Sequence, residues 1–360
     1  MTEPTQPAEL PLRLLFWEST ARCNLACRHC RRLDMDDTEG GVLTTAEAER
    51  MIDQAADLGR PIIVFSGGEP LLRDDWERLA RHAAGRGLPT ALATNGTLVD
   101  DAVARRIAAA GFQRVSVSLD GPDAPTHDAI RGAAAFDAAM AGIVALRAAG
   151  VSVQINTTVT AGNFDRLDRM EALAVSVGAV ALHLFVLVPV GCGLELSERD
   201  RLSPEQCEGV LEWVVARQAA GAIELKATCA PQVARIARQW LASHGSTGSP
   251  PSRHEPGADR VRAGLRGKGC LAGTGVIFVA HNGEVFPCGY LPASCGNLRR
   301  GDLREIWRGS EVLLRLRETE RLTGNCGRCE YARVCGGCRA RAFAETGDFL
   351  AGEPMCLYNR

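Results

Sequence analysis

Residues 14–20, Leu-Leu-Phe-Trp-Glu-Ser-Thr, run almost directly into residues 23–30, Cys-Asn-Leu-Ala-Cys-Arg-His-Cys, so a strand-like stretch leads into a C-x3-C-x2-C loop. Three thiolates can hold three irons of a [4Fe–4S] cube and leave the fourth iron without a protein ligand. The alternative is structural zinc, which takes four closed ligands, usually in two paired knuckles. His29 is available as a fourth zinc ligand, but it stands between two of the cysteines. The spacing therefore favours an iron–sulfur cluster on Cys23, Cys27 and Cys30.

Beyond this loop, short apolar runs alternate with longer amphipathic ones as far as Val190. The runs expected to form strands are Leu12–Glu18, Pro61–Ser66, Pro89–Thr94, Arg114–Leu119, Val151–Thr158 and Ala181–Val188. The runs expected to form helices are Thr45–Leu58, Asp74–Gly85, Asp100–Ala110, Ala134–Ala149, Asn163–Val177 and Ser203–Ala219. Repeated β–α units of this length predict an α/β fold with a parallel sheet and helices outside it. Six units predict a partial (β/α)6 TIM-like barrel, with function at the carboxyl ends of the strands.

The chain divides into four predicted segments: an N-terminal tail (1–11), the barrel (12–220), a connecting segment and linker (221–264) and a cysteine-rich C-terminal domain (265–360). The linker is expected within His244–Asp259, which is rich in Ser, Gly and Pro. The C-terminal segment carries eight of the fourteen cysteines. Such a short segment buries little surface, so metal ligation would supply much of its stability.

Composition excludes several classes of function. The formal net charge of -2 gives no electrostatic argument for binding nucleic acid or a membrane surface. The longest apolar stretch, Ala179–Val190, is too short to cross a bilayer and contains His183. The chain begins without a signal-peptide pattern, so a reducing, cytoplasmic compartment is expected. In that compartment, cysteine clusters indicate metal sites and not disulfides.

Glycine-rich and polar turns follow the second, third and fourth predicted strands. They are Ser66-Gly-Gly-Glu-Pro70, Thr94-Asn-Gly-Thr-Leu98 and Ser116-Val-Ser-Leu-Asp-Gly121, with Arg131 ten residues further on. Paired glycines let a ligand approach the backbone closely. Each turn alone has an ordinary explanation as a turn or helix cap. Together they lie at successive strand ends around one rim, which indicates a shared site.

These motifs resemble those of the radical SAM (S-adenosylmethionine) superfamily over Leu12–Val190. The resemblance implies a [4Fe–4S] cluster on the three cysteines of the loop, whose open iron chelates the amine and carboxylate of SAM. The other residues that it implies around SAM are His29 beside the cluster, Gly67, Gly68, Glu69 and Pro70 at the amine, Ser118 and Arg131 at the carboxylate, and Asn95 and Asn156 at the nucleoside. An electron passed to SAM would release a 5′-deoxyadenosyl radical, which takes hydrogen from carbon.

The C-terminal cysteines have their own spacing, C-x12-G-x4-C followed by C-x2-C-x5-C-x2-C-x17-C. This pattern resembles the SPASM extension of radical SAM enzymes, although relatives usually have three residues, not two, between the cysteines matching Cys335 and Cys338. The resemblance implies one or two auxiliary [4Fe–4S] clusters. The ligands of the first would be Cys326, Cys329, Cys335 and Cys356. Those left for a second are Cys270, Cys288 and Cys338, with Cys192, Cys229 and Cys295 as spare candidates for a fourth.

Several phrases narrow the resemblance to the tetrapyrrole-modifying enzymes of the siroheme-dependent haem pathway and the haem d1 pathway. They are Val188-Pro-Val-Gly-Cys-Gly193, Lys226-Ala-Thr-Cys-Ala-Pro-Gln232, Pro287-Cys-Gly-Tyr-Leu291 and Glu353-Pro-Met-Cys-Leu-Tyr358. Relatives more often have Arg at position 192 and often have His at position 232. The closer resemblance is to the haem synthases, which implies oxidative decarboxylation of Fe-coproporphyrin III propionates to vinyl groups. Arg339 and Arg341, beside the cluster loop, are candidates for binding substrate carboxylates, although arginines in such a position more often lie on a solvated surface.

Three other functions stay open at this point. One is a different tetrapyrrole side-chain modification of the haem d1 type. Another is maturation of ribosomal peptides or sulfatases, against which only about eleven residues precede the first strand. The third is a cluster-bearing electron carrier, which would need four ligands per cluster and no SAM site. The expected partners are a tetrapyrrole substrate and an electron donor such as flavodoxin or ferredoxin, with no nucleic acid and no membrane.

Overall fold

The computed structural model describes residues 10–31, 41–196, 198–244, 256–265 and 269–358. Most of the predicted N-terminal tail and the centre of the predicted linker lie outside these ranges. Within them, a ten-stranded sheet has the order β10-β9-β8-β1-β2-β3-β4-β5-β6-β7. The strands are β1 (Leu14–Glu18), β2 (Ile62–Ser66), β3 (Thr90–Thr94), β4 (Arg114–Ser118), β5 (Val153–Val159), β6 (Ala181–Val186), β7 (Glu224–Thr228), β8 (Val276–Val279), β9 (Glu284–Phe286) and β10 (Gly296–Asn297).

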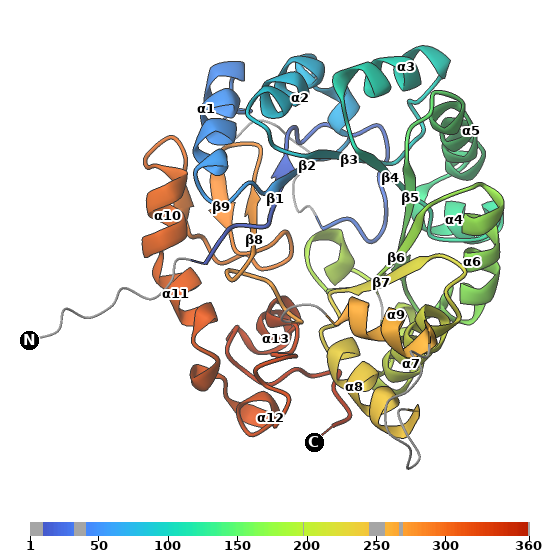
Figure 1. Cartoon of the computed structure of the whole chain (residues 1–360), viewed down its shortest axis with the longest axis vertical. Helices are drawn as coiled ribbons and strands as arrows, with labels where there is room; N and C mark the ends of the chain where they lie inside the picture. The colour runs from blue at the N-terminus through green and yellow to red at the C-terminus, as the bar shows by residue number, and fades with distance from the viewer. Residues whose placement is uncertain (1–9, 32–40, 197, 245–255, 266–268, 359–360) are drawn as a thin grey trace, which may run out of the picture.

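Strands β1 to β7 pair in parallel in chain order, and Figure 1 shows them curving around a central axis with helices on the outside. The helices of the barrel are α1 (Thr45–Ala56), α2 (Trp76–Gly85), α3 (Asp101–Ala110), α4 (Ala124–Arg131), α5 (Ala135–Ala148), α6 (Leu167–Ser176) and α7 (Pro204–Ala220). The partial barrel and its six predicted strands are confirmed. The ends of the predicted elements differ by a few residues, and helix α4 was not predicted.

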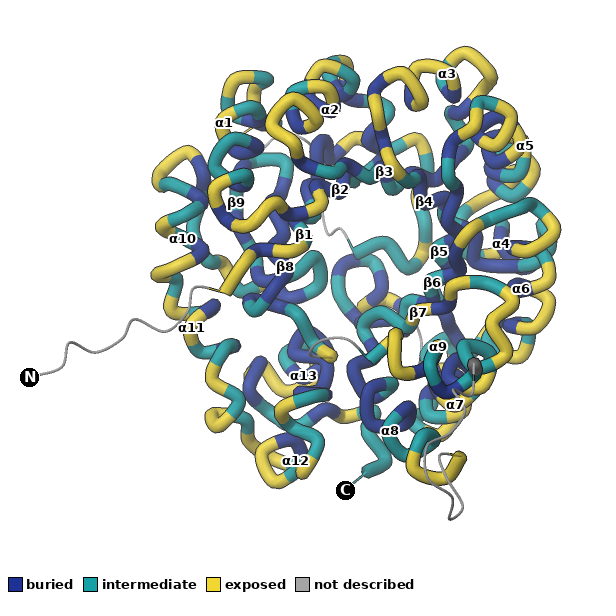
Figure 2. The backbone as a smooth tube through the Cα atoms, in the orientation of Figure 1, coloured by how far each residue is buried: buried dark blue, intermediate teal, exposed yellow. Residues whose placement is uncertain are grey.

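Local sequence explains why these elements form. Helix α1 starts at a capping box in which the Thr44 side chain accepts from the Glu47 backbone and the Glu47 side chain accepts in return. In β1, Leu15 and Trp17 are fully buried while Leu14 and Phe16 on the other face are half-buried. This alternation buries one face of the sheet beneath the helices, as Figure 2 shows by the dark strands and the yellow outer helix faces.

The C-terminal segment is joined to the barrel through the sheet itself. Strand β8 pairs in parallel with β1, from Leu14 opposite Val276 to Trp17 opposite Val279. In Figure 1 the orange β8 therefore lies beside the blue β1. The helices after the barrel are α8 (Val233–His244), α9 (Pro256–Gly264), α10 (Leu303–Gly309), α11 (Glu311–Arg317), α12 (Gly324–Gly327) and α13 (Arg339–Thr346). The predicted domain boundaries at residues 220 and 265 therefore both fall between strands of one continuous sheet. The division of the chain into domains stays a prediction.

The segment 221–264, expected to be a connection and linker, contributes regular structure. Strand β7 extends the parallel sheet beyond β6, and α8 and α9 pack against α7. The expected linker is wrong for residues 256–259, because α9 begins at Pro256. No single helix in the described ranges has the length and apolar composition to cross a membrane. One bent pair, α4 with α5 (106°), meets those criteria jointly.

Candidate functional site

The three-cysteine loop leaves the carboxyl end of β1, as the sequence predicted. All three thiols are partly exposed. The Cys30 backbone N–H donates to the Cys27 carbonyl at 3.1 Å, which closes a tight turn. The Arg28 N–H donates to the Ile130 carbonyl at 3.0 Å, which ties the loop to the end of α4. The loop is therefore closed by its own turn and fixed to the barrel rim at α4.

The Gly67–Gly68 turn after β2 packs directly against the backbone that leads into the loop. The Gly68 N–H donates to the Thr20 carbonyl and the Glu69 N–H to the Arg22 carbonyl, both at 2.8 Å. A Cβ on Gly67 would lie 2.6 Å from Thr20 O, and one on Gly68 would lie 2.3 Å from Arg22 O. At these two Cα positions, the protein's own backbone therefore makes the close approach that was expected of a ligand. Pro70 then starts a short 3-10 turn.

Glu69 points into the protein and joins the ends of β2 and β3. Its carboxylate is fully buried and accepts hydrogen bonds from Thr94 Oγ1 (2.8 Å), Asn95 N (2.9 Å) and Leu71 N (3.3 Å). Burial raises the pKa of Glu69 to about 7, although these hydrogen bonds oppose the shift. A role of this carboxylate at the SAM amine stays a prediction.

The raised pKa of Glu69 predicts a specific dependence of stability on pH. The ordinary value is 4.5, so between pH 4.5 and about 7 the folded chain holds a proton that the unfolded chain has lost. Stability should therefore fall as pH rises through this window. We expect the difference in unfolding free energy between wild type and Glu69→Gln to drop from pH 4.5 to 7 and then level off, measured by anaerobic urea unfolding.

Glu47→Gln is the control for this measurement. A hydrogen bond from Arg299 lowers the pKa of Glu47 to about 2, so its contribution changes only in acid. The difference in unfolding free energy between wild type and Glu47→Gln should stay nearly constant from pH 4.5 to 7. A flat difference for Glu69→Gln as well would contradict the assignment of a buried proton to Glu69.

Asn95, after β3, holds the start of the cysteine loop. Asn95 Nδ2 donates to Asn24 Oδ1 at 2.8 Å, and Asn24 Nδ2 donates to Thr97 Oγ1 at 2.8 Å. Asn24 follows Cys23 directly, so the third strand end positions the loop. The Asn95 amide is thereby bound to protein, and a contact to the nucleoside stays a prediction.

Asp120 is the buried centre of the fourth strand end. Its carboxylate is fully buried, accepts from Arg131 Nε at 2.5 Å and from Thr158 N at 2.7 Å, and lies 3.2 Å from His29 Nε2. Burial would raise the pKa of Asp120, but the charges of Arg131 and His29 outweigh it and hold the pKa far below its ordinary range. Arg131 Nη1 in turn lies 3.9 Å from Cys27 Sγ. The structure thus joins Arg131 to His29 of the loop through Asp120, which was not among the predicted ligands.

One ring nitrogen of His29 has no hydrogen-bond partner among the described residues. Its Nε2 faces Asp120 and Arg131, whereas its Nδ1 is buried and has no hydrogen-bond partner among the described residues. A buried polar atom without a partner fits a site completed by a bound group. The thiols, the orphan nitrogen and the cation of Arg131 together fit a cluster with a carboxylate-bearing cosubstrate.

Ser118 and Asn156 are neighbours across the sheet, opposite each other in the pairing of β4 with β5. Asn156 Oδ1 accepts from Gln154 Nε2 at 2.7 Å. Ser118 is the last residue of β4, on the rim that carries the loop, whereas Asn156 lies in the middle of β5. Their contacts to SAM stay predictions.

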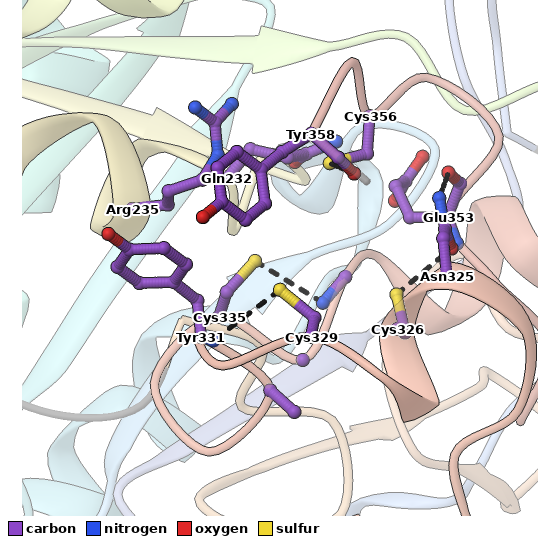
Figure 3. Close-up of a pocket in the computed structure, with 13 residues that line it drawn as sticks. Gln232, Arg235, Asn325, Cys326, Cys329, Tyr331, Cys335, Glu353, Cys356 and Tyr358 are labelled. Carbon is purple, nitrogen blue, oxygen red and sulfur yellow. Dashed lines mark hydrogen bonds between the residues drawn. The ribbon is translucent and has the colours of Figure 1, made fainter. Parts of the chain in front are cut away.

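Four C-terminal cysteines line one cavity, and they are the four that the resemblance to SPASM domains implied for the first auxiliary cluster. About 360 Å³ of space lies between the lining atoms, part of it open to solvent. Figure 3 shows the thiols of Cys326, Cys329, Cys335 and Cys356 around it. No group of three or more His, Cys, Asp or Glu in the described ranges is arranged to hold a single metal ion.

Backbone N–H groups are aimed at three of these sulfurs. Tyr331 N lies 3.4 Å from Cys329 Sγ, Gly337 N 3.4 Å from Cys335 Sγ, and Glu353 N 3.3 Å from Cys326 Sγ. Hydrogen bonds to sulfur are one of the means by which proteins stabilise iron–sulfur clusters. The donor set of this cavity therefore fits a cluster.

The remaining SPASM cysteines lie together at a second place. Cys288 packs against Cys338 in a small buried cluster, and Cys270 lies within electrostatic range of both. A fourth thiol, that of Cys229 directly after β7, packs against the same cluster. Of the three spare cysteines, Cys229 is thus the one found beside this group.

The expectation for Arg339 and Arg341 is wrong. Both side chains are buried. Arg339 Nη1 donates to the Ala351 carbonyl at 2.7 Å, and Arg341 pairs with Glu353 at 3.2 Å. Their guanidinium groups hold the C-terminal turns in place and are not exposed to a substrate.

Comparison with known proteins agrees with this geometry. Residues 17–174 match the model of the radical SAM superfamily, and residues 270–338 match that of SPASM, an iron–sulfur cluster-binding domain. The chain is 48% identical over 347 residues to the AdoMet-dependent heme synthase of Methanosarcina barkeri, spanning 96% of each chain. It is 32% identical over 382 residues to the pre-heme d1 synthase of Dinoroseobacter shibae, spanning 99% of this chain and 88% of that one. The solved structure of native anSMEcpe with bound AdoMet superposes with a TM-score of 0.68 at 19% identity, covering 95% of this chain and 93% of that chain.

Proposed function

Because the chain belongs to the radical SAM superfamily, in the SPASM-bearing group that includes the AdoMet-dependent heme synthases, we propose that it decarboxylates Fe-coproporphyrin III oxidatively to haem. Two propionate side chains would become vinyl groups. The observation that carries the proposal is the 48% identity to a heme synthase along 96% of both chains. The cytoplasm as its compartment and a flavodoxin or ferredoxin as its electron donor are part of the same proposal.

The cluster and SAM, when bound, would supply a carbon radical able to take hydrogen from a propionate. Cys23, Cys27 and Cys30 would hold that cluster. The chain's own contribution is to fix the loop, since the Gly67–Gly68 turn and Asn95 bind its backbone and Asn24. Arg131, oriented by Asp120, places a cation beside Cys27 where a carboxylate of SAM is expected.

The first prediction is the reaction itself. Anaerobic incubation of reconstituted protein with SAM, a reductant and Fe-coproporphyrin III should give 5′-deoxyadenosine and a porphyrin lighter by two formic acid equivalents, measured by mass spectrometry. A variant with Cys23, Cys27 and Cys30 all replaced by Ala should give neither product. Deoxyadenosine with an unchanged porphyrin would contradict the substrate and leave the radical chemistry intact.

We also propose that the chain holds two auxiliary clusters. The first would be bound by the four cysteines of the cavity in Figure 3, and the second by Cys270, Cys288 and Cys338 with Cys229 as fourth ligand. Cys229 has a left-handed backbone (φ 57°), a strained conformation for a residue with a Cβ. Such strain is kept where the surroundings require one orientation of the side chain.

A second prediction follows for Cys229→Ala. We expect loss of up to one cube of iron and sulfide per chain, or a changed electron paramagnetic resonance (EPR) signal of one auxiliary cluster. Cys295→Ala is the matched control, because Cys295 packs against the main core and away from this group. Equal iron content and an identical spectrum in both variants would contradict Cys229 as a ligand.

Another tetrapyrrole modification, of the haem d1 type, is the second candidate function. It is favoured by the 32% identity to a pre-heme d1 synthase along 99% of this chain. The same assay separates the two candidates when each tetrapyrrole is offered in turn, because the product masses differ.

A further inference from the structure

One wall of the cavity framed by Cys326, Cys329, Cys335 and Cys356 comes from a distant part of the chain. Gln232 and Arg235, at the start of α8, line it opposite the cysteine turns, as Figure 3 shows. They precede the first of these cysteines by about ninety residues. The fold thus brings a polar side-chain wall to a site whose cysteines are all local to one another.

Gln232 is a buried amide without a partner. Only 1% of its surface is exposed, and within the described residues neither Nε2 nor Oε1 makes a hydrogen bond. Leaving a buried polar group unsatisfied is unfavourable, because the group loses its hydrogen bonds to water and gains none in return. Its backbone carbonyl, in contrast, accepts from Arg235 N at 2.9 Å and from Ile236 N at 3.1 Å. The helix start therefore fixes where the orphan amide lies.

The neighbouring Arg235 is already neutralised. Its Nη2 lies 2.6 Å from both carboxylate oxygens of Glu208, and Nη1 donates to Gln239 Oε1 at 2.8 Å. Its guanidinium also lies 5.2 Å above the Tyr358 ring. Arg235 is held by these contacts through both terminal nitrogens, and only its Nε is buried without a partner among the described residues. Both polar atoms of the Gln232 amide, in contrast, are left to whatever fills the cavity.

We propose that the Gln232 side-chain amide donates an N–H hydrogen bond to a sulfur of the auxiliary cluster in this cavity and thereby raises the reduction potential of that cluster. A cluster gains one negative charge on reduction, so a donor stabilises the reduced form more than the oxidised form. The Gln232 amide would then donate to the same cluster as the backbone N–H groups of Tyr331, Gly337 and Glu353. The inference rests on the cluster placement proposed above and is independent of the tetrapyrrole substrate.

The test compares Gln232→Met, which removes both amide atoms from an unbranched chain, with Gln232→His, which keeps an N–H donor. Each is made in full-length protein with Cys23, Cys27 and Cys30 replaced by Ala, so that the N-terminal cluster is absent. Midpoint potentials are measured by mediated dithionite titration followed by EPR. The relevant signal is the one abolished by a further Cys335→Ala change.

We expect Gln232→Met to lower the midpoint potential and Gln232→His to restore most of it, with unchanged iron and sulfide in both. Gln218→Met is the matched control, since Gln218 Nε2 donates to the Leu225 carbonyl at 2.9 Å, away from the cavity. Its potential should equal that of the parent protein.

Two results would overturn the proposal. An unshifted potential in Gln232→Met would show that the amide does not bond to the cluster. Loss of iron in Gln232→Met but not in Gln232→His would show that the amide holds the site together and does not tune it. Unchanged iron in the Cys335→Ala chain would instead overturn the cluster placement, and with it this inference.

Discussion

Replacing Asp120 by Asn is expected to lower the free energy of unfolding by about 3–5 kcal/mol, because it leaves Arg131 as a buried cation without its counter-ion. The Asp120 side chain is fully buried and that of Arg131 is only 11% exposed, so solvent screens the pair little. The measurement is anaerobic chemical denaturation of reconstituted protein. The double variant Asp120→Asn with Arg131→Met should recover part of the loss, since it removes both partners.

Asp123→Asn is the matched control for this prediction. Asp123 caps the N-terminus of α4 and pairs with Arg169 at 2.9 Å, but 30% of its side chain is exposed. Asn caps helices as well as Asp, and an exposed ion pair contributes about 0–1 kcal/mol, so little change is expected. An Asp120→Asn variant as stable as Asp123→Asn would show that the buried pair does not anchor the site.

Gly191→Ala is expected to remove the iron of the N-terminal cluster and to lower SAM cleavage by about 100-fold, the effect of a small displacement of reacting groups. Gly191, in the turn after β6, has φ 59°, and a Cβ there would lie 2.3 Å from both the carbonyl carbon and oxygen of Arg31. It would also lie 2.7 Å from Cys30 O. Only backbone movement relieves these contacts, so the third cysteine would shift. Iron, sulfide and 5′-deoxyadenosine are the quantities to measure.

Gly193→Ala, two residues away, separates this effect from a general intolerance of the turn. The nearest atom to its added Cβ is Val188 O at 3.6 Å, an ordinary van der Waals distance. We expect full iron content and full SAM cleavage in this variant. Normal loading of the N-terminal cluster in Gly191→Ala would contradict the view that the sixth strand end holds the loop.

The six barrel strands were predictable because each carries apolar residues that the helices bury. Strand β7 was missed since only Leu225 in it is buried, between Glu224 and Lys226, which are exposed. Helix α4 is short, with Pro125 in its first turn, and its start lies beside a turn motif. The four residues of β8 form an apolar run, but nothing in the sequence says that β1 is their partner.

The residues of the candidate site likewise divide into those that the sequence predicted and those that only the structure showed. Cys326 and Cys329, like the N-terminal three, are close in sequence, so their spacing alone indicated a shared site. The roles of Asp120 and Gln232 depend on α4 and α8, which no pattern had predicted, and so they were found only from the structure. Arg341 shows the converse error, because its position beside a cysteine motif suggested exposure although its side chain is buried.

The pairing of β8 with β1 also has a consequence for biosynthesis. Among the described strands β1 is the earliest in the chain, yet its outer edge is completed by residues made about 260 positions later. At roughly 5–20 residues per second, that edge waits on the order of tens of seconds with unpaired backbone groups, which is a condition that invites misassembly between nascent chains. Cells that make this protein should therefore depend on chaperone capacity during its synthesis, and a gene truncated before Val276 should yield an insoluble product and not a working half.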